Sequence, residues 1–484
     1  MISPTKQSLG RVKKVHLIAI CGMGMGSLAG LLKEKGFEVT GSDDNIYPPM
    51  STQLESLGIP LYQGYRPENL SSNLDLVIVG NAVSRTNPEV TALLEGGRLA
   101  QKKIPTLSMP QALFEFFLKE KTPLVVAGTH GKTTTASLLA WILNHAGRDA
   151  GFLIGGILKN FKKSYHLGGG PYFVVEGDEY DTAFFDKGPK FVHYAPQMVL
   201  LGPVEFDHAD IYKDLNDVMG AFEKLIPVIP PNGFLVACAD SPQTLKLASL
   251  FSGRKTTYGF SLQAEWRAEQ ITFTAEEANF QVVYRGKRLG SVRSPLAGRH
   301  NIQNLLGVIA LTTNIGFCLE EINRALARFE SVKRRQEVRG TVHDVIVVDD
   351  FAHHPTAIAE TITAIRSRYP GHFLWALFEP RSNTSRRNIF QGEFVQSLAG
   401  ADEVVIADLY QPEKIPAGER LDPQKLAGDI TQGGTRARFI PAVPEIVSTV
   451  VREVVPPAVL LVMSNGGFGG IHSKLLETLK ERFQ

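Results

Sequence analysis

The segment from Val125 to Thr135 has the residue types and spacing of a nucleotide-phosphate site. An apolar run ends at a glycine turn, and Lys132 and Thr133 open a helix-like run that continues to residue 143. A strand, a glycine turn and a helix N-terminus together surround phosphates with backbone N–H groups and the positive end of the helix. Lys132 could then reach the outer phosphates, and the Thr133 hydroxyl could complete a Mg²⁺ shell.

Acidic residues and a histidine follow two later apolar runs. Glu176 comes after the run 172–175, and a carboxylate at the C-terminal end of a strand near a phosphate loop suits Mg²⁺. Glu176 could therefore bind metal, whereas the acids at 178, 179 and 181 are most simply interpreted as a solvated turn. His208 lies beside a carboxylate in Glu205–Asp210, where a neutral imidazole is a reasonable second metal ligand, although a lone histidine is more often structural.

A second glycine-rich loop, Gly22 to Gly26, comes directly after the apolar run 16–20. Asp43 ends the next strand-like run, about where an acid binds ribose in a dinucleotide site. Such a loop lets a phosphorylated ligand approach the backbone but does not define which one. A nicotinamide oxidoreductase would also need a hydride-transfer site, and no later motif supplies it.

The C-terminal third carries acids, histidines and arginines. Asp349 and Asp350 end an apolar run and are followed by His353 and His354, where the loops of an open sheet meet ligands. Arg381, Arg386 and Arg387 could bind carboxylates in bidentate fashion, and the glycines of 466–470 leave backbone accessible to a ligand. A solvated helix start and a strand–helix turn are the structural alternatives for these two features.

The elements that must position these residues alternate between strand-like and helix-like runs. Residues 14–118 predict a doubly wound parallel sheet, and apolar strands between 345 and 463 predict a second open sheet. Between them, the polar alternation of 256–292 favours antiparallel strands. Linker-like composition at 119–123 and the basic residues 333–335 divide this α/β chain into expected domains 1–119, 120–331 and 332–484.

Length and composition agree with a large multidomain protein. The 484 residues exceed one ordinary core, and the net charge of +2 gives no sign of a nucleic-acid partner. The three cysteines lie far apart, as expected for thiols in a reducing compartment. No apolar stretch is long enough to span a bilayer. We expect a cytoplasmic protein without membrane insertion, and the sequence leaves the oligomeric state open.

Taken in order, these motifs resemble those of the Mur ligase family, the cytoplasmic ATP-dependent amide-bond ligases of peptidoglycan assembly. The loop 128–134 reads Gly-Thr-His-Gly-Lys-Thr-Thr, the family's form, with Val126 where the general phosphate loop has glycine. The acidic run from 176 resembles the family's Glu-Ala-Asp-Glu. The resemblance implies three domains: a Rossmann-like N-terminal domain, a P-loop ATPase-like central domain and a Rossmann-like C-terminal domain.

The resemblance also implies a role for each matched residue, with ATP and Mg²⁺ as cofactors. The expected ATP-binding residues are Gly128, Thr129, His130, Gly131, Lys132, Thr133, Thr134, Asn304, Arg335 and Asp350. A UDP-sugar is expected at Gly22, Gly24, Gly26, Asp43, Asn81 and Ser84. Expected metal ligands are Thr133, Glu176 and His208, and expected catalytic residues are Lys132, His208, Asp350 and His353. Pro203 departs from the family's asparagine, so a side-chain contact made there is absent.

Further motifs indicate the branch of the family. The segments 41–52, 184–187, 205–212, 349–355, 379–384 and 463–472 resemble the recycling branch more than the L-alanine-adding enzymes. That branch joins the lactyl carboxylate of UDP-N-acetylmuramate, through an acyl phosphate, to the amine of L-Ala-γ-D-Glu-meso-diaminopimelate. The peptide is expected at Arg381, Asn383, Arg386, Asn465 and Gly466.

Three points stay open at this stage. L-alanine is the alternative amine, and a nucleotide-gated binding protein without turnover is the non-enzymatic alternative. The base that deprotonates the amine is either His208 or His353.

Overall fold

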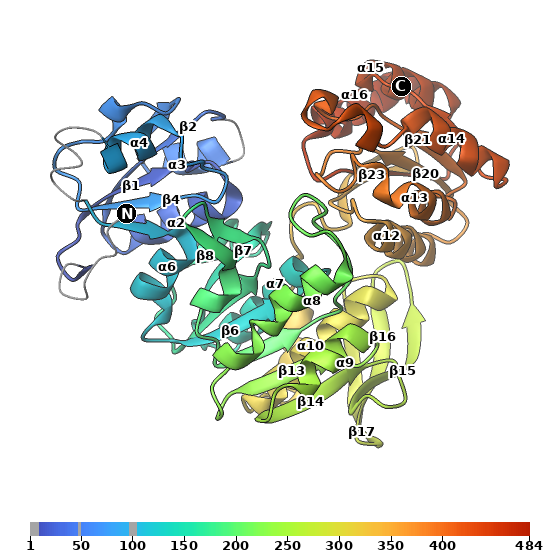
Figure 1. Ribbon diagram of the computed structural model, residues 1–484. Coiled ribbons are helices and arrows are strands. Elements are labelled where there is room, and N and C mark those ends of the chain that lie inside the picture. The colour runs from blue at the N-terminus through green and yellow to red at the C-terminus, as the bar shows by residue number, and fades with distance from the viewer. Residues whose placement is uncertain (1–8, 47–49, 96–103) are drawn as a thin grey trace. The chain divides into compact units, whose positions relative to one another are not determined.

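The computed structural model describes residues 9–46, 50–95 and 104–484 (Figure 1). The chain forms two compact units. Unit 1 comprises Met1–Val204, Asn216–Trp266 and Gly307–Ala325, and unit 2 comprises Glu205–Leu215, Arg267–Leu306 and Leu326–Gln484. The chain passes between the units within β15 (Trp266–Phe273) and within α10 (Arg299–Asn314).

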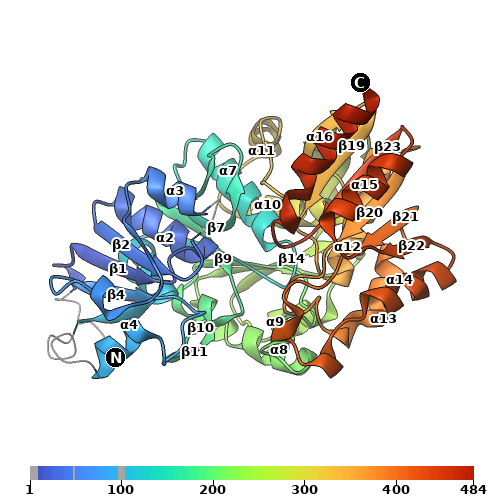
Figure 2. The same ribbon diagram turned by 90° about the horizontal axis from the view of Figure 1, so that it is seen from above.

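The N-terminal part of unit 1 is a parallel sheet in the order β3-β2-β1-β4-β5. Its strands are β1 (Lys14–Ile18), β2 (Glu38–Asp43), β3 (Leu61–Gln63), β4 (Leu76–Val79) and β5 (Thr106–Ser108). Its helices include α2 (Met23–Glu34), α3 (Met50–Ser56), α4 (Pro88–Glu95) and α6 (Met109–Leu113). The strand order reverses between β1 and β4, so α2 and α4 cover opposite faces (Figure 2). Ligands of such sheets bind at this reversal, outside the carboxyl ends of the strands.

The second sheet of unit 1 carries the phosphate loop. Its strands lie in the order β14-β13-β12-β6-β9-β7-β8, and all neighbours are parallel except β7 and β8. They are β6 (Thr122–Ala127), β7 (Gly151–Leu158), β8 (Lys163–His166), β9 (Tyr172–Gly177), β12 (Met198–Leu201), β13 (Phe234–Cys238) and β14 (Arg254–Gly259). The helices are α7 (Lys132–His145), α8 (Leu215–Glu223), α9 (Pro242–Ser249) and α11 (Leu319–Leu326). A separate antiparallel hairpin, β10 (Asp181–Ala183) and β11 (Asp186–Pro189), leads into the short helix η3 (Lys190–His193).

Unit 2 contains an open sheet in the order β18-β19-β23-β20-β21-β22, in which only β18 runs antiparallel to its neighbour. The strands are β18 (Glu337–Val342), β19 (Val345–Asp350), β20 (Phe373–Phe378), β21 (Glu403–Ile406), β22 (Arg436–Phe439) and β23 (Ala458–Met463). The helices are α12 (Pro355–Arg368), α13 (Gln391–Leu398), α14 (Pro423–Gln432), α15 (Val443–Glu453) and α16 (Ile471–Phe483). The unit also holds β16 (Ala278–Tyr284) paired antiparallel with β17 (Lys287–Ser294).

Both faces of this open sheet are buried, which explains the apolar strands seen in the sequence. Ile346 and Val348 of β19 pack with residues of α12, α13 and α14, whereas Val345 and Val347 pack with residues of α15 and α16. Successive side chains of a strand point to opposite faces, so a strand covered on both sides is apolar throughout.

The predicted fold class is therefore confirmed, with one local correction. The polar alternation of 256–292 was expected to form antiparallel strands. β16 and β17 pair in this way, but residues 256–259 belong to β14, which pairs parallel with β13. The domain boundaries at 119/120 and 331/332 stay predictions.

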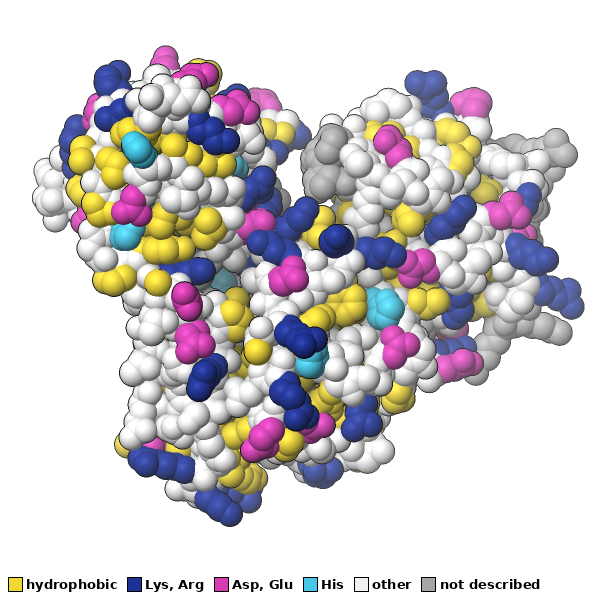
Figure 3. Space-filling view, turned by 180° about the vertical axis from the view of Figure 1, so that it is seen from behind, with side chains coloured by type: hydrophobic (Ala, Val, Ile, Leu, Met, Phe, Trp, Pro, Cys, Tyr) yellow, Lys and Arg dark blue, Asp and Glu magenta, His cyan; other side chains and the backbone are white. Residues whose placement is uncertain are grey.

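Basic and acidic side chains are interspersed over the face seen in Figure 3, in keeping with a net charge of +2. Among the described residues, none of the helices combines the length and apolarity that crossing a membrane requires.

Candidate active site

The phosphate loop joins β6 to α7, and its backbone requires two glycines. Gly128 has φ +129°, and a Cβ there would lie 3.0 Å from the Cα of Gly202. Gly131 caps α7 in the left-handed conformation with φ 75°. The first turn of α7 contains no acidic residue, so its N–H groups and positive dipole end are suited to an anion.

Lys132 lies inside this loop and is paired with a buried acid. Its Nζ is 2.9 Å from Glu179 Oε2 and donates to the Gly128 carbonyl at 2.7 Å. Burial lowers the pKa of Lys132, but the carboxylates of Glu179 and Asp178 outweigh burial, and the net pKa is raised. Lys132 therefore carries its charge at neutral pH.

The solvated-turn interpretation of the acids after Glu176 is wrong for Glu179, whose side chain is only 1% exposed. Asp178 is half-buried and lies 2.5 Å from Lys190 Nζ. Burial raises the pKa of Asp178, but Lys190 and Lys132 lower it further, so it stays ionised. Both acids are therefore held by lysines.

Thr133 and Glu176 form an oxygen pair beside the loop. Thr133 Oγ1 donates to Glu176 Oε2 at 3.1 Å, and the other carboxylate oxygen accepts from the Gly155 N–H at 2.6 Å. A hydroxyl and a carboxylate next to a phosphate cradle are the hard ligands that Mg²⁺ uses together with phosphate oxygens, so these residues fit the expected ion. Thr129 N donates to the Pro203 carbonyl at 2.8 Å, a backbone contact that proline retains.

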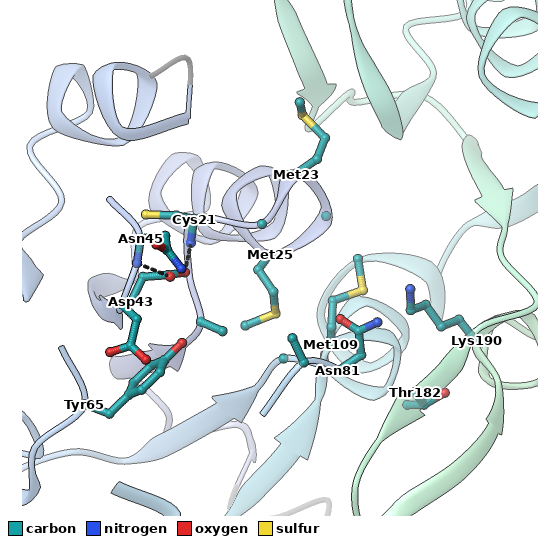
Figure 4. Close-up of a pocket in the computed structure, with 16 residues that line it drawn as sticks. Cys21, Met23, Met25, Asp43, Asn45, Tyr65, Asn81, Met109, Thr182 and Lys190 are labelled. Carbon is teal, nitrogen blue, oxygen red and sulfur yellow. Dashed lines mark hydrogen bonds between the residues drawn. The ribbon is translucent and has the colours of Figure 1, made fainter. Parts of the chain in front are cut away.

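A cavity of about 480 Å³ lies at the carboxyl ends of β1 and β4 in unit 1. It is lined by Ala19, Cys21, Gly22, Met23, Gly24, Met25, Asp43, Asp44, Asn45, Tyr65, Gly80, Asn81, Ala82, Met109, Thr182 and Lys190 (Figure 4). Of the six residues expected to bind a UDP-sugar, Gly22, Gly24, Asp43 and Asn81 line it, whereas Gly26 and Ser84 do not. The site coincides with the topological reversal of the sheet, where a phosphorylated ligand is expected.

Three of the expected UDP-sugar residues have structural contacts in this region. Asp43 Oδ2 accepts from the Cys21 N–H and Oδ1 from the Asn45 N–H, both at 2.9 Å, so this carboxylate holds the loops around the cavity. A Cβ on Gly26 would lie 2.1 Å from Met50 Sδ, so this glycine allows α3 to pack against α2. Ser84 Oγ lies 2.9 Å from Thr86 Oγ1 outside the cavity.

Sequence reasoning missed several lining residues. Tyr65 and Met109 belong to no motif, and Asn45 lies in the segment 41–52, which was used only to indicate the branch of the family. Thr182 and Lys190 come from the hairpin and η3, more than 100 residues after the glycine loop in the chain. The only signal near them was the segment 184–187, which comprises the turn of the hairpin and the first residues of β11.

In unit 2, Asp350 and Arg335 lie in one cluster. Asp350 ends β19, and its two oxygens accept backbone N–H groups of Gln336 and Ala352, both at 2.8 Å. Burial raises the pKa of Asp350 although Arg335 opposes the shift, and the net pKa is raised. The Arg335 guanidinium lies 4.9 Å from the centre of the Phe351 ring. Asn304 of α10 is buried.

The histidines of unit 2 differ in their surroundings. His354 caps α12, accepts from Thr356 N at 3.3 Å and lies 3.2 Å from the Phe206 carbonyl, so both of its ring nitrogens have contacts. His353 is partly exposed, with Nδ1 3.1 Å from the Phe351 carbonyl. His208 has φ 57°, and its N–H donates to Asp207 Oδ1 at 2.6 Å.

The segment that carries His208 is fixed within unit 2. Asp207, 4% exposed, accepts a hydrogen bond from Thr384 Oγ1 at 2.8 Å. Asp210 Oδ2 accepts from Asn383 Nδ2 at 2.9 Å. These two bonds attach the predicted metal-binding element to the loop that follows β20, which is also the loop of the expected peptide ligands.

The expected peptide residues fall into two groups. Arg386 is buried and donates to the carbonyls of Tyr410 and Gln411 and to Asn383 Oδ1, at 2.9, 3.1 and 2.7 Å. Its guanidinium and the Asn383 amide therefore hold the loop together. Arg381, by contrast, stacks over the Tyr410 ring at 3.6 Å and is 23% exposed.

Gly466 and Asn465 lie beside Arg381. A Cβ on Gly466 would lie 1.9 Å from Arg381 Nε, so only glycine leaves room for this arginine. Asn465 Oδ1 is buried without a hydrogen-bond partner among the described residues. The structure thus brings Arg381, Asn465 and Gly466 together, with a cation and an unused acceptor.

Three family models match consecutive parts of the chain. They are the Mur ligase family catalytic domain at residues 14–119, the Mur ligase middle domain at 126–312 and the glutamate ligase domain of Mur ligases at 334–466. A UDP-N-acetylmuramate–L-alanyl-γ-D-glutamyl-meso-2,6-diaminoheptandioate ligase of Escherichia coli K12 is 42% identical, over 97% of this chain and 99% of that protein.

Solved structures agree with these matches. A murein peptide ligase of Psychrobacter arcticus superposes with a TM-score of 0.70 at 35% identity, and a UDP-N-acetylmuramate–alanine ligase of Thermotoga maritima with 0.79 at 25% identity. Both comparisons cover 97% of this chain and 99% of the other. The chain belongs to the Mur ligase family, and it is an ATP-dependent ligase that forms amide bonds.

Proposed function

We propose that this protein joins the lactyl carboxylate of UDP-N-acetylmuramate to the amine of L-alanyl-γ-D-glutamyl-meso-diaminopimelate, and that ATP is converted to ADP and phosphate. The observation that carries this is the 42% identity, over nearly the whole of both chains, to the Escherichia coli ligase whose name states these two substrates. The fold alone does not identify the amine substrate, because the alanine ligase structure gives a TM-score at least as high as that of the murein peptide ligase.

In this proposal the phosphate loop of unit 1 binds ATP. The N–H groups at the start of α7 receive the phosphates, Lys132 neutralises charge on the phosphoryl group in transfer, and Thr133 and Glu176 hold Mg²⁺. The bound ion supplies charge neutralisation at the phosphate oxygens. Glu179 keeps Lys132 charged and in the loop.

The sugar nucleotide occupies the 480 Å³ cavity of unit 1. We assign its diphosphate to the N-terminus of α2, because Gly22 and Gly24 leave the backbone there accessible. The lactyl carboxylate attacks the γ-phosphorus of ATP: an acyl–O–P bond forms, the bond to ADP breaks, and ADP leaves. The substrate carboxylate is itself the nucleophile, so the proposed reaction contains no covalent enzyme intermediate.

The amine half of the reaction is assigned to unit 2. Arg381 over Tyr410, with Asn465 and Gly466 beside it, would receive a carboxylate of the tripeptide. The amine attacks the acyl carbon, the C–N bond forms and phosphate leaves. A base takes the proton of the ammonium. His208 and His353, which lie in the matched sequence motifs, are the proposed bases.

A place in peptidoglycan recycling and a cytoplasmic location belong to the same proposal. The amine substrate is a complete cell-wall tripeptide rather than a single amino acid, so a reaction that releases peptide from existing wall must supply it. Both other substrates are nucleotides, which are cytoplasmic metabolites.

The test measures ADP release in the presence of Mg²⁺, with each of the three substrates omitted in turn. We expect release only when ATP, UDP-N-acetylmuramate and the tripeptide are all present, and almost none with L-alanine in place of the tripeptide. Lys132→Ala should abolish release. Release driven by L-alanine alone would assign the protein to the alanine-adding reaction, and silence with both amines would favour a nucleotide-gated binding protein.

A further inference from the structure

Lys190 of η3 is the cation that the hairpin contributes to the sugar-nucleotide cavity. Its side chain is 16% exposed, lines the cavity and has one close acid, Asp178, with Nζ 2.5 Å from Oδ2. The backbone strengthens this pairing, because the Lys190 N–H donates to the Asp178 carbonyl at 3.0 Å. Lys190 is therefore held at the cavity by two contacts with Asp178, one from its ammonium and one from its backbone N–H.

The cavity has two ends, and Lys190 lies at one of them. Figure 4 shows Asp43, Asn45 and Tyr65 on one side of Met25, and Asn81, Thr182 and Lys190 on the other. Met25 belongs to the first turn of α2, whose N-terminus is the proposed diphosphate site. A sugar nucleotide that lies across this helix end must place its nucleoside toward one group and its sugar toward the other.

The connection to the phosphate loop decides which end receives the sugar. Asp178, the partner of Lys190, lies in the chain between Glu176 and Glu179. The carboxylates of these two glutamates contact Thr133 at 3.1 Å and Lys132 at 2.9 Å, respectively, at the loop proposed to bind the γ-phosphate. The reacting carboxylate must meet that phosphate, so the acyl end of the sugar nucleotide has to point toward Lys190. The opposite end, with two acids at Asp43 and Asp44, would repel a carboxylate.

We propose that Lys190 binds the lactyl carboxylate of the sugar nucleotide and that Asp178 holds it in place for this contact. This assignment rests on the proposed function. It gives the cavity a means of choosing a UDP-sugar that bears a carboxylate, because a neutral substituent would leave the ammonium with no new partner. Lys190 also offsets the repulsion that the carboxylate and the γ-phosphate exert on each other.

Binding measurements by calorimetry test this assignment, with Mg²⁺ and a non-hydrolysable ATP analogue present. The two ligands are UDP-N-acetylmuramate and UDP-N-acetylglucosamine, which lacks the lactyl group. We expect Lys190→Met to weaken binding of the first ligand about tenfold to hundredfold, as loss of a charged hydrogen bond does, and to change binding of the second less than threefold. Lys190→Arg should retain most of the preference for the carboxylate.

Lys187→Met is the matched control. Lys187 lies on the same hairpin, is 67% exposed and pairs with Asp181 at 2.8 Å outside the cavity lining. Its loss should leave both affinities unchanged. A fall in the Lys187 variant equal to that of Lys190→Met would overturn the proposal, since the effect would then come from the hairpin as a whole.

A double variant separates ligand binding from a structural role. If Lys190 only neutralises Asp178, then Asp178→Asn combined with Lys190→Met should restore binding of UDP-N-acetylmuramate. We expect it to stay weak. Restored binding, normal binding by Lys190→Met alone, or an equal loss for both ligands would each overturn the assignment. If the wild-type protein binds neither ligand, the proposed function itself fails, and the inference fails with it.

Discussion

Replacing Glu179 by glutamine should lower stability and strengthen ATP binding. Both Glu179 oxygens lie within 3.1 Å of Lys132 Nζ, and the carboxylate is 1% exposed. A charged hydrogen bond contributes about 1.5 to 3 kcal/mol. Because Lys132 keeps its bonds to the carbonyls of Gly128 and Thr129, we expect a loss near the lower limit, about 2 kcal/mol.

The opposite effect on ATP has an electrostatic cause. In the wild-type protein Glu179 competes with phosphates for the Lys132 ammonium, and it places a negative charge beside the loop. Removing that charge should tighten ATP binding about tenfold, which corresponds to about 1.4 kcal/mol. Turnover should fall, because Lys132, bonded only to the carbonyls of Gly128 and Thr129, would be less firmly positioned when the acyl phosphate forms.

Thermal unfolding and calorimetric titration of ATP with Mg²⁺ measure the two effects on the same sample. Asp181→Asn is the control, because it removes the acid of the exposed pair with Lys187, and exposed pairs contribute less than about 1 kcal/mol. If Glu179→Gln weakens ATP binding, the competition argument is refuted, and Glu179 acts by presenting Lys132 to the phosphates.

Two further predictions concern unit 2. Gly466→Ala places a Cβ 1.9 Å from Arg381 Nε, so the arginine must leave the Tyr410 ring. In steady-state kinetics we expect the KM for the tripeptide to rise about tenfold and the KM for ATP to stay unchanged. A rise in both KM values would contradict a peptide-specific role. Burial, with Arg335 nearby, lowers the pKa of His300 from 6.5 to about 4. The unfolded chain therefore binds the proton first, so stability is lost as pH falls from about 6.5 toward 4, by about 2 kcal/mol between pH 7 and 5. Melting temperatures of wild type and His300→Asn should converge over this range, and parallel curves would show that His300 titrates normally.

Local sequence predicted the features that depend on short-range geometry. The phosphate loop needs Gly128 and Gly131 in backbone conformations that other residues rarely adopt, so the glycines are visible in the sequence. Glu176 lies near the carboxyl end of β9, which the apolar run 172–175 indicates in the sequence. The two open sheets were predicted because strands covered on both faces are apolar throughout.

Features that depend on distant residues were not predicted. The run 178–181 has the composition of a solvated turn, yet Glu179 is buried, and its carboxylate contacts Lys132, which lies 47 residues earlier in the chain. Arg381 and Arg386 occur in one short segment and have equal sequence signals. In the structure, Arg386 donates to the Tyr410 carbonyl, whereas Arg381 stacks on the Tyr410 ring. The two arginines therefore differ because of a loop that lies 24 residues after Arg386 in the chain.

The most direct test of the central claim is mass spectrometry of the product formed when the two amines compete. The purified protein would receive ATP, Mg²⁺ and UDP-N-acetylmuramate with equal concentrations of the tripeptide and L-alanine. Our account predicts a single new nucleotide, UDP-N-acetylmuramate joined to the tripeptide, together with ADP in equal amount. UDP-N-acetylmuramoyl-L-alanine as the main product would contradict it.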